Sequence, residues 1–322
     1  MDTIFVLVHG AWHASWQWAA TQRGLAALGA TSLALDLPGH GFSAPMPDTY
    51  LDPGQCRLNS AQSELAGLSS AECAAEIVAA LRSVRRYRRV VLVAHSAGGG
   101  PASAAAEQAP ELVDTLIYLS AFVPAGRPRF ADYLAAPEQT ATALGGGLIL
   151  GDPDRIGAFR INPISPDPAY VEELRQTYYH DVPVREFDRW RHALSPDLPV
   201  SIPTTPITLT RERWGSIPRV FIRCADDRAA TPAMQDLMIA EADAAMPDQP
   251  FTVHTLPGGH APFAARPAAL ADVLCGAVAP SRGLPARPGE QLPVRPRDRR
   301  AKPGVAQLMS NSLPSGSCIP TA

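Results

Sequence analysis

The sequence predicts an α/β fold with a mostly parallel central sheet, helices on both faces of the sheet and an inserted helical cap. Short runs of branched apolar residues alternate with helical patterns over residues 1–123, and the alternation returns over residues 210–279. The run Val90–Ala94 is apolar throughout, which is typical of a strand buried on both faces. Strands that alternate with helices form parallel sheets. We therefore expect one α/β core built from two segments of the chain.

The elements of this core follow from their residue patterns. The helix at Ser69–Val84 begins with Ser69 and Glu72 three residues apart, a spacing that predicts a capping box. The expected strands are Ile4–Val8, Thr31–Leu35, Val90–Ala94, Thr115–Leu119, Arg219–Arg223 and Phe251–Leu256, and the expected helices are Trp16–Leu28, Ser69–Val84, Pro101–Ala109, Pro232–Ala244 and Pro267–Val278.

Two segments depart from the α/β pattern. Residues 124–209 are rich in proline, with weak helical patterns only around Tyr133 and over Val171–Tyr179, and we interpret them as the cap. Residues 280–322 hold eight prolines, and seven basic residues against two acidic ones. Such a segment buries too little apolar surface to offset its ordering entropy. We expect a disordered Pro/Arg-rich tail whose charge is solvated or contacts a partner.

Composition excludes several classes of partner. A net charge of −3 and a pI near 6.2 give no reason to expect nucleic acid as the main partner. No apolar stretch approaches the roughly 18 residues of a membrane span. No basic segment or cleavage signal precedes the apolar run Ile4–Val8, so we expect no signal peptide. The sequence carries no signal for an oligomeric state.

The cysteines predict neither a zinc site nor a disulfide framework. Their number is odd, their spacings are wide, and no Cys-x-x-Cys pair occurs. Thiols that stay reduced are typical of the cytoplasm, which is the location we expect. The five cysteines are Cys56, Cys73, Cys224, Cys275 and Cys318.

A serine follows the buried strand Val90–Ala94. Residues 94–98 read Ala-His-Ser-Ala-Gly, the G-x-S-x-G pattern of a nucleophile elbow with alanine in the first glycine position. Such a turn lifts the hydroxyl of Ser96 above the sheet, and the next helix directs its N–H groups toward the same spot. The glycines at 98–100 fit neither a Rossmann nor a phosphate loop. Taken alone, the five residues fit a buried structural serine equally well.

A serine nucleophile needs a base, and the base needs an orienting acid. When the order is serine, acid, histidine, the base follows the last strand. His254 lies inside that expected strand, whereas His260 lies in the loop after it, at the carboxyl edge where catalytic groups gather. We predict His260 as the base. Asp226 and Asp227 both follow the preceding strand, and spacing alone does not choose between them.

Backbone N–H groups are expected to hold the oxyanion. Ala97 directly follows the serine, and Ala11 lies in the loop after the first strand, where Gly10 lets the chain turn sharply. Aromatic side chains fit either a pocket wall or ordinary packing. The pocket candidates are Trp12, His13, His95, Phe122 and Trp190. Tyr178 and Tyr179 in the expected cap, and Trp214 just beyond it, could also line the pocket or could form the core of the cap.

Five motifs together resemble a known family. They are similar to the α/β-hydrolase branch of plant methyl esterases, hydroxynitrile lyases and bacterial serine esterases, over about residues 3–278. The resemblance implies the α/β-hydrolase fold and favours Asp227 as the acid, because the family's acid matches the residue before Arg228-Ala229. The motifs are Phe5-Val6-Leu7-Val8-His9-Gly10-Ala11-Trp12-His13, Leu35-Asp36-Leu37-Pro38-Gly39-His40-Gly41, Ala94-His95-Ser96-Ala97-Gly98-Gly99, Cys224-Ala225-Asp226-Asp227-Arg228-Ala229 and Gly259-His260-Ala261-Pro262-Phe263.

Two positions separate activities within this branch. The lyases carry threonine where this chain has Gly10, and a lysine after the catalytic histidine where it has Ala261. The resemblance therefore implies a serine esterase that acts through an acyl-enzyme, without metal or organic cofactor. If the aromatic residues of the cap line the pocket, they suit a small or medium lipophilic ester. Alternatives on the same fold are a thioester or C–C bond hydrolase, a lyase-like enzyme and a ligand-binding receptor.

Overall fold

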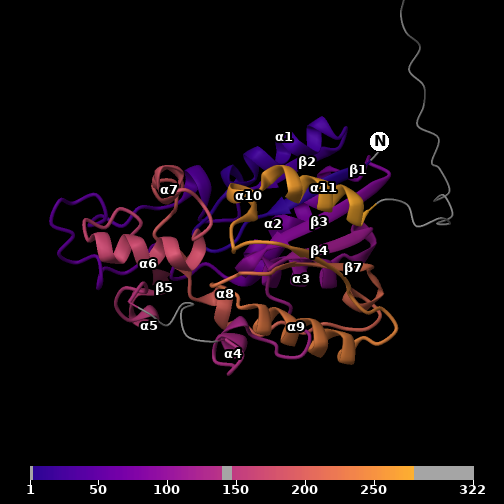
Figure 1. Cartoon of the computed structure of the whole chain (residues 1–322). Coiled ribbons are helices and arrows are strands. Elements are labelled where there is room, and N and C mark those ends of the chain that lie inside the picture. Colours follow the sequence, from indigo (N-terminus) through magenta and orange to yellow (C-terminus); the bar gives the residue numbers. More distant parts are fainter. Residues whose placement is uncertain (1–2, 140–146, 279–322) are drawn as a thin grey trace, which may run out of the picture. The chain divides into compact units, whose positions relative to one another are not determined.

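A parallel sheet of six strands forms the centre of the computed structural model, which describes residues 3–139 and 147–278 (Figure 1). The strand order is β2-β1-β3-β4-β7-β8, and every neighbouring pair is parallel. The predicted parallel central sheet is thereby confirmed. The strands are β1 (Thr3–Val8), β2 (Thr31–Leu35), β3 (Arg89–His95), β4 (Thr115–Leu119), β7 (Arg219–Cys224) and β8 (Thr252–Leu256).

The strand order reverses direction next to β1. This strand pairs with β2 on one side and with β3 on the other, so that Val8 lies opposite both Leu35 and Ala94. The loops that follow β1 and β3 therefore leave the same edge of the sheet side by side. Open α/β sheets bind their ligands at such a switch point.

Helices cover both faces of the sheet. On one face α1 (Ala19–Ala27) contacts α11 (Pro267–Ala277), and on the other α2 (Ser70–Ser83) contacts α3 (Gly99–Gln108) (Figure 1). The capping box forms as predicted, since the hydroxyl of Ser69 accepts from the N–H of Glu72 and the Glu72 carboxylate accepts from the N–H of Ser69.

Element ends differ from the predicted ones by a few residues. A 3-10 turn at Ser15–Trp18 precedes α1, and α3 begins two residues before the predicted Pro101. The helix α9 (Pro232–Ala245) connects β7 to β8. A 3-10 turn at Gly41–Ser43 lies within the long connection after β2. The remaining 3-10 turns of the core are Ser96–Gly98, Pro110–Leu112 and Trp214–Ser216.

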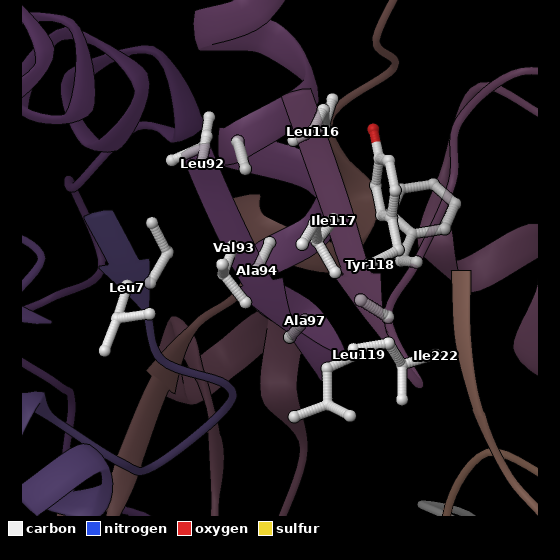
Figure 2. Packing of buried hydrophobic residues seen from close by; sticks show 14 of the residues in the cluster. Leu7, Leu92, Val93, Ala94, Ala97, Leu116, Ile117, Tyr118, Leu119 and Ile222 are labelled. Carbon is white, nitrogen blue, oxygen red and sulfur yellow. The ribbon is translucent and has the colours of Figure 1, made fainter. Parts of the chain in front are cut away.

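The inner strands supply the hydrophobic core. Side chains of β3 and β4 pack next to each other, with Leu7 of β1 and Ile222 of β7 beside them (Figure 2). Leu92, Ile117 and their neighbours in these strands are fully buried. Burying each such side chain stabilises the fold by roughly 1.5–3 kcal/mol. The ends of these strands are therefore held rigidly, and with them the loops that follow.

The segment 124–209 folds into short elements beyond the sheet edge. Helices occur around Tyr133 and over most of Val171–Tyr179, as predicted. The structure also has two short antiparallel strands here, which the sequence pattern did not predict. Each of these strands has three residues, too few for a periodic signal. The elements are α4 (Phe130–Leu134), α5 (Pro153–Ile156), β5 (Ala158–Arg160), α6 (Pro168–Tyr178), α7 (Val184–Arg191), β6 (Asp197–Pro199) and α8 (Ser201–Thr204).

A buried ion pair joins β5 to β6. Arg160 donates to both carboxylate oxygens of Asp197, at 2.6 and 2.7 Å, and its side chain is fully buried. The same guanidinium donates to the carbonyl oxygens of Leu58 and Ala61 in the long connection after β2. Arg160 thus links the connection after β2 to the two-stranded sheet of β5 and β6 by hydrogen bonds.

Three findings complete the description of the chain. No helix within residues 3–139 and 147–278 is both long and apolar enough to cross a membrane. The predicted tail, residues 280–322, and Cys318 lie outside the described residues. The four cysteines within the described residues, Cys56, Cys73, Cys224 and Cys275, form no disulfide, and of these four only Cys56 is exposed.

Asp197→Ala should lower the free energy of unfolding by about 3–5 kcal/mol, because it leaves the guanidinium of Arg160 buried without its carboxylate. Urea denaturation of the purified variant measures this change. Asp248→Ala is the matched control, since its pair with Arg211 is largely exposed and should contribute no more than about 1 kcal/mol. Equal losses in the two variants would contradict the prediction.

Candidate active site

Ser96 lies in a strained turn between β3 and α3. Its backbone φ is +52°, a left-handed conformation that is unusual for a residue with a side chain. Glycine is required two residues later, because a Cβ at Gly98 would lie 2.2 Å from the carbonyl oxygen of His9. The turn therefore has the geometry expected of a nucleophile elbow.

His260 connects Ser96 to a carboxylate. Its Nε2 lies 2.9 Å from the hydroxyl oxygen of Ser96, and its Nδ1 lies 2.7 Å from an oxygen of Asp227. Because a carboxylate accepts, Nδ1 carries the proton and Nε2 accepts from the serine hydroxyl. The loops after β3, β7 and β8 bring the three side chains together. His254, the other candidate, lies within β8.

The two neighbouring aspartates have different surroundings. Asp227 is 3% exposed, and besides His260 it accepts from the hydroxyl of Ser120 at 2.6 Å and from two backbone N–H groups, those of Ala229 and Ala230, at 2.8 Å each. Asp226 is exposed, and its carboxylate accepts from the N–H of Gly258. The structure thus places Asp227, and not Asp226, against the imidazole.

The loop after β1 passes directly over the serine. A Cβ at Gly10 would lie 2.8 Å from Nδ1 of His95 and 2.9 Å from the Cβ of Ser96, so that a side chain there would require these neighbours to move. Trp12 has a φ of +60°, and its indole N–H donates to the carbonyl of Phe159 while its own carbonyl accepts from the N–H of Ser195. Two cap residues therefore hold this loop in a conformation that is unfavourable in isolation.

Two more histidines stand beside the candidate site as neutral groups. His13 donates from Nδ1 to the carbonyl of Ala11 at 2.6 Å, and its Nε2 accepts from the hydroxyl of Tyr179 at 2.5 Å. Burial lowers the pKa of His13 to about 3. Burial, and next the charge of His260, holds the pKa of His95 well below its ordinary value. His95 donates from Nε2 to the carbonyl of His260.

A cavity opens at the hydroxyl of Ser96. Fourteen of the nineteen residues that line it are apolar or aromatic, and none is Asp, Glu, Lys or Arg. Within the described part of the chain no cluster of His, Cys, Asp and Glu could hold a metal ion. The lining residues are Ala11, Trp12, His13, His95, Ser96, Ser120, Ala121, Phe122, Phe130, Leu134, Phe159, Tyr178, Leu198, Pro203, Ala229, Ala230, Met234, Met238 and His260.

Four of the five pocket candidates line this cavity, and Trp190 does not. Helix α7 packs the Trp190 ring against Trp16 and Phe263, behind the cavity wall. Trp214 is also outside the cavity, since it is fully buried and donates to the hydroxyl of Tyr118. The four that line the cavity are Trp12, His13, His95 and Phe122.

Sequence reasoning did not identify two residues that support the site, Ser120 and Asp181. Ser120 directly follows β4, which neighbours β7, and its hydroxyl donates to Asp227, a proximity that only the strand order reveals. Asp181, after α6, accepts from the N–H of Gly259 at 3.0 Å and pairs with Arg266. Tyr178, which the sequence left open between pocket and cap core, lines the cavity. No sequence signal marks the contacts of Asp181.

An all-parallel sheet with a nucleophile-elbow turn at its switch point defines the class of α/β hydrolases. The chain belongs to the Alpha/beta hydrolase family, which it matches over residues 5–273. The predicted resemblance to the methyl esterase branch is confirmed by relatives among curated and solved proteins.

These relatives include curated plant proteins and solved hydrolase structures. Methylesterase 7 of Arabidopsis thaliana is 28% identical over 239 residues, which cover 73% of this chain and 82% of that protein. The crystal structure of a pyrethroid hydrolase is 25% identical with a TM-score of 0.64, over 85% of this chain and 96% of that one. A methylesterase from Arabidopsis has the same fold, at 24% identity and a TM-score of 0.61, over 86% and 98% of the two chains. The names methylesterase and pyrethroid hydrolase agree with the predicted class, a carboxylic ester hydrolase.

Acid should destabilise the protein through its buried histidines. The pKa of His13 falls from 6.5 to about 3 on folding, so between these values the unfolded chain binds more protons than the folded protein. Stability therefore falls as the pH drops through this window. His13→Gln should reduce the slope of unfolding free energy against pH, between pH 4 and 6, by about 1.4 kcal/mol per pH unit.

Urea denaturation at each pH measures this slope. His192→Gln is the matched control, because His192 is exposed and the same substitution there should leave the slope as in the wild type. A slope unchanged by His13→Gln would show that His13 does not contribute to the acid sensitivity.

Proposed function

We propose that this protein is a serine esterase in which Ser96, His260 and Asp227 act as a catalytic triad. The observation that carries the proposal is the pair of contacts of His260, 2.9 Å to the serine hydroxyl and 2.7 Å to the buried carboxylate. Nucleophile, base and orienting acid are then in contact in the order that acyl transfer requires.

The reaction follows from these contacts. His260 Nε2 takes the proton of Ser96 as the hydroxyl oxygen attacks the ester carbonyl carbon. Asp227 holds Nδ1–H in place and stabilises the imidazolium. The imidazolium then gives its proton to the leaving alcohol, and an acyl-enzyme remains on Ser96. Water attacks this ester with His260 again as the base, which releases the acid and restores the serine.

The oxyanion would be held by the N–H groups of Ala11 and Ala97. Ala97 follows the serine at the start of the 3-10 turn, and Ala11 lines the cavity from the loop after β1. The hydrogen bond from His13 to the Ala11 carbonyl supports this role, because it fixes the loop that presents the Ala11 N–H. Pre-oriented donors of this kind contribute roughly 2.7–4 kcal/mol each to transition-state stabilisation.

The cavity supports a neutral, lipophilic ester of small or medium size as substrate. Its walls are mostly apolar or aromatic, and no Asp, Glu, Lys or Arg among the described residues lines them to pair with a charged substrate. We further propose a cytoplasmic location, which rests on the cysteine pattern, and a small-molecule substrate with no nucleic acid or membrane partner, which rests on charge and hydropathy.

The alternatives differ in what they require at the site. A hydroxynitrile lyase of this branch would carry a lysine where this chain has Ala261, which is 1% exposed and offers no charge. A thioester or C–C bond hydrolase would use the same triad. A ligand-binding receptor would bind in the cavity without turnover, and the contacts of His260 favour an enzyme over it.

Ser96→Ala should abolish ester turnover, since loss of the nucleophile of such a triad costs about 10⁶ in kcat. His260→Ala should be similarly inactive, with both variants folded. Turnover is measured on aryl and alkyl esters of graded acyl length, and a fluorophosphonate probe should label the wild type at Ser96. Ser60→Ala, at an exposed serine, is the control and should keep activity and labelling. Labelling elsewhere, or an active Ser96→Ala, would refute the assignment.

Asp227→Asn should lower kcat by about 10⁴, because the amide no longer holds the productive tautomer of His260. Asp226→Asn is the matched control one residue away. Its amide oxygen can still accept from the N–H of Gly258, so we expect activity within a few-fold of the wild type. Steady-state kinetics on one aryl ester measures both, and the reverse order of effects would move the acid to Asp226.

A further inference from the structure

Tyr178 has a buried hydroxyl that the proposed mechanism does not use. The residue ends α6, is 7% exposed and lines the cavity that contains Ser96. Its hydroxyl has no hydrogen-bond partner among residues 3–139 and 147–278. Other tyrosines behave differently, since the hydroxyl of Tyr179 bonds to His13 and that of Tyr170 bonds to the carbonyl of Leu148.

A buried hydroxyl without a partner is costly, because it has lost water and gained nothing in return. The phenol stays protonated, since burial raises its pKa, and nearby Tyr170 and Asp227 act in the same direction. It can therefore donate. The partner is to be sought in the cavity, because Tyr178 forms part of the wall and the part of the chain that the structure describes offers none.

The ring of Tyr178 is fixed beside the reacting groups. It meets Trp12 edge-on with the ring centres 5.6 Å apart, and its centre lies 5.9 Å from that of His260. A donor held by such contacts keeps its position when the cavity fills, so it can select a ligand by where an acceptor lies.

The oxygens of the reacting ester already have partners in the proposed mechanism. The carbonyl oxygen goes to the N–H groups of Ala11 and Ala97, and the leaving oxygen goes to His260. The hydroxyl of Tyr178 remains for a further oxygen. Since no Asp, Glu, Lys or Arg of the described residues lines the cavity, that oxygen belongs to a neutral group such as an ether, carbonyl or hydroxyl.

We propose that Tyr178 is a specificity-determining residue that donates a hydrogen bond to a second, neutral acceptor oxygen of the substrate, away from the ester that is cleaved. The substrates are then lipophilic esters with one additional oxygen function, rather than plain hydrocarbon esters. The inference rests on the proposed esterase function. A hydrocarbon ester would leave the phenol unpaired, which is how a polar group in a pocket rejects a ligand without the matching atom.

An oxygen scan of the substrate tests this inference. The parent esters are methyl octanoate and octyl acetate, and each analogue replaces one methylene by an ether oxygen, which adds an acceptor with little change of shape. For each analogue, kcat/KM is divided by that of its parent, in the wild type and in Tyr178→Phe. For the analogue whose ether oxygen reaches the Tyr178 hydroxyl, we expect this ratio to be about three- to tenfold higher in the wild type than in Tyr178→Phe. Intrinsic reactivity cancels in the comparison.

Tyr170→Phe is the matched control. It removes a phenol from the same helix, but Tyr170 does not line the cavity, so the wild-type profile should persist. Identical profiles for the wild type and Tyr178→Phe would overturn the inference. A loss in Tyr178→Phe by one common factor for parents and all analogues would also overturn it, because the hydroxyl would then serve the reacting ester or the packing.

Binding separates this inference from the proposed function. Titration calorimetry of the analogues with Ser96→Ala and with the double variant Ser96→Ala, Tyr178→Phe measures the dissociation constants without turnover. A position-dependent difference in affinity without turnover in the wild type would refute the esterase and retain the role of Tyr178 as a ligand donor. Turnover without any such difference in rate or affinity would retain the esterase and refute the role of Tyr178.

Discussion

The close approach of the loop after β1 to the turn after β3 governs the geometry of the candidate active site. A Cβ at residue 98 would lie 2.2 Å from the carbonyl oxygen of His9, and a Cβ at Gly10 would lie 2.9 Å from the Cβ of Ser96. Parallel pairing of β1 with β3 imposes this approach, since Val8 and Ala94 end opposite each other. Glycine at both positions lets the two loops pack closely against each other, and the proposed oxyanion donors, the N–H groups of Ala11 and Ala97, lie in these loops.

Residues of the segment 124–209 form hydrogen bonds to two loops beside Ser96, the loop after β1 and the loop that carries His260. Phe159 and Ser195 bond to Trp12 in the loop after β1, and Asp181 bonds to Gly259 directly before His260. The left-handed backbone of Trp12 is thus supported from outside the α/β core. Substitutions at Asp181 would act on the position of the imidazole without contact to a substrate, and a 1 Å displacement of a reacting group can cost about 100-fold in rate.

The parts that sequence predicts well are those encoded by neighbouring residues. Strand periodicity, the Ser69–Glu72 cap and the elbow at Ser96 depend on spacings of a few positions, and they recur in the structure. Asp226 and Asp227 could not be separated by spacing, because strand direction and register decide which carboxylate faces the imidazole. Trp190 was assigned to the pocket wrongly, since only the packing of α7 decides which wall its ring meets.

The three histidines that line the cavity divide their tasks according to their partners. Of these three histidines, only His260 has a carboxylate as a hydrogen-bond partner, whereas His13 and His95 donate to carbonyl oxygens. Burial lowers the pKa of both of these imidazoles and keeps them neutral, and a charge on either would repel the imidazolium proposed at His260. His13 thus supports the loop that carries Ala11, and His95 supports the backbone of His260. In the proposed mechanism, positive charge develops at His260, between Asp227 and the leaving group.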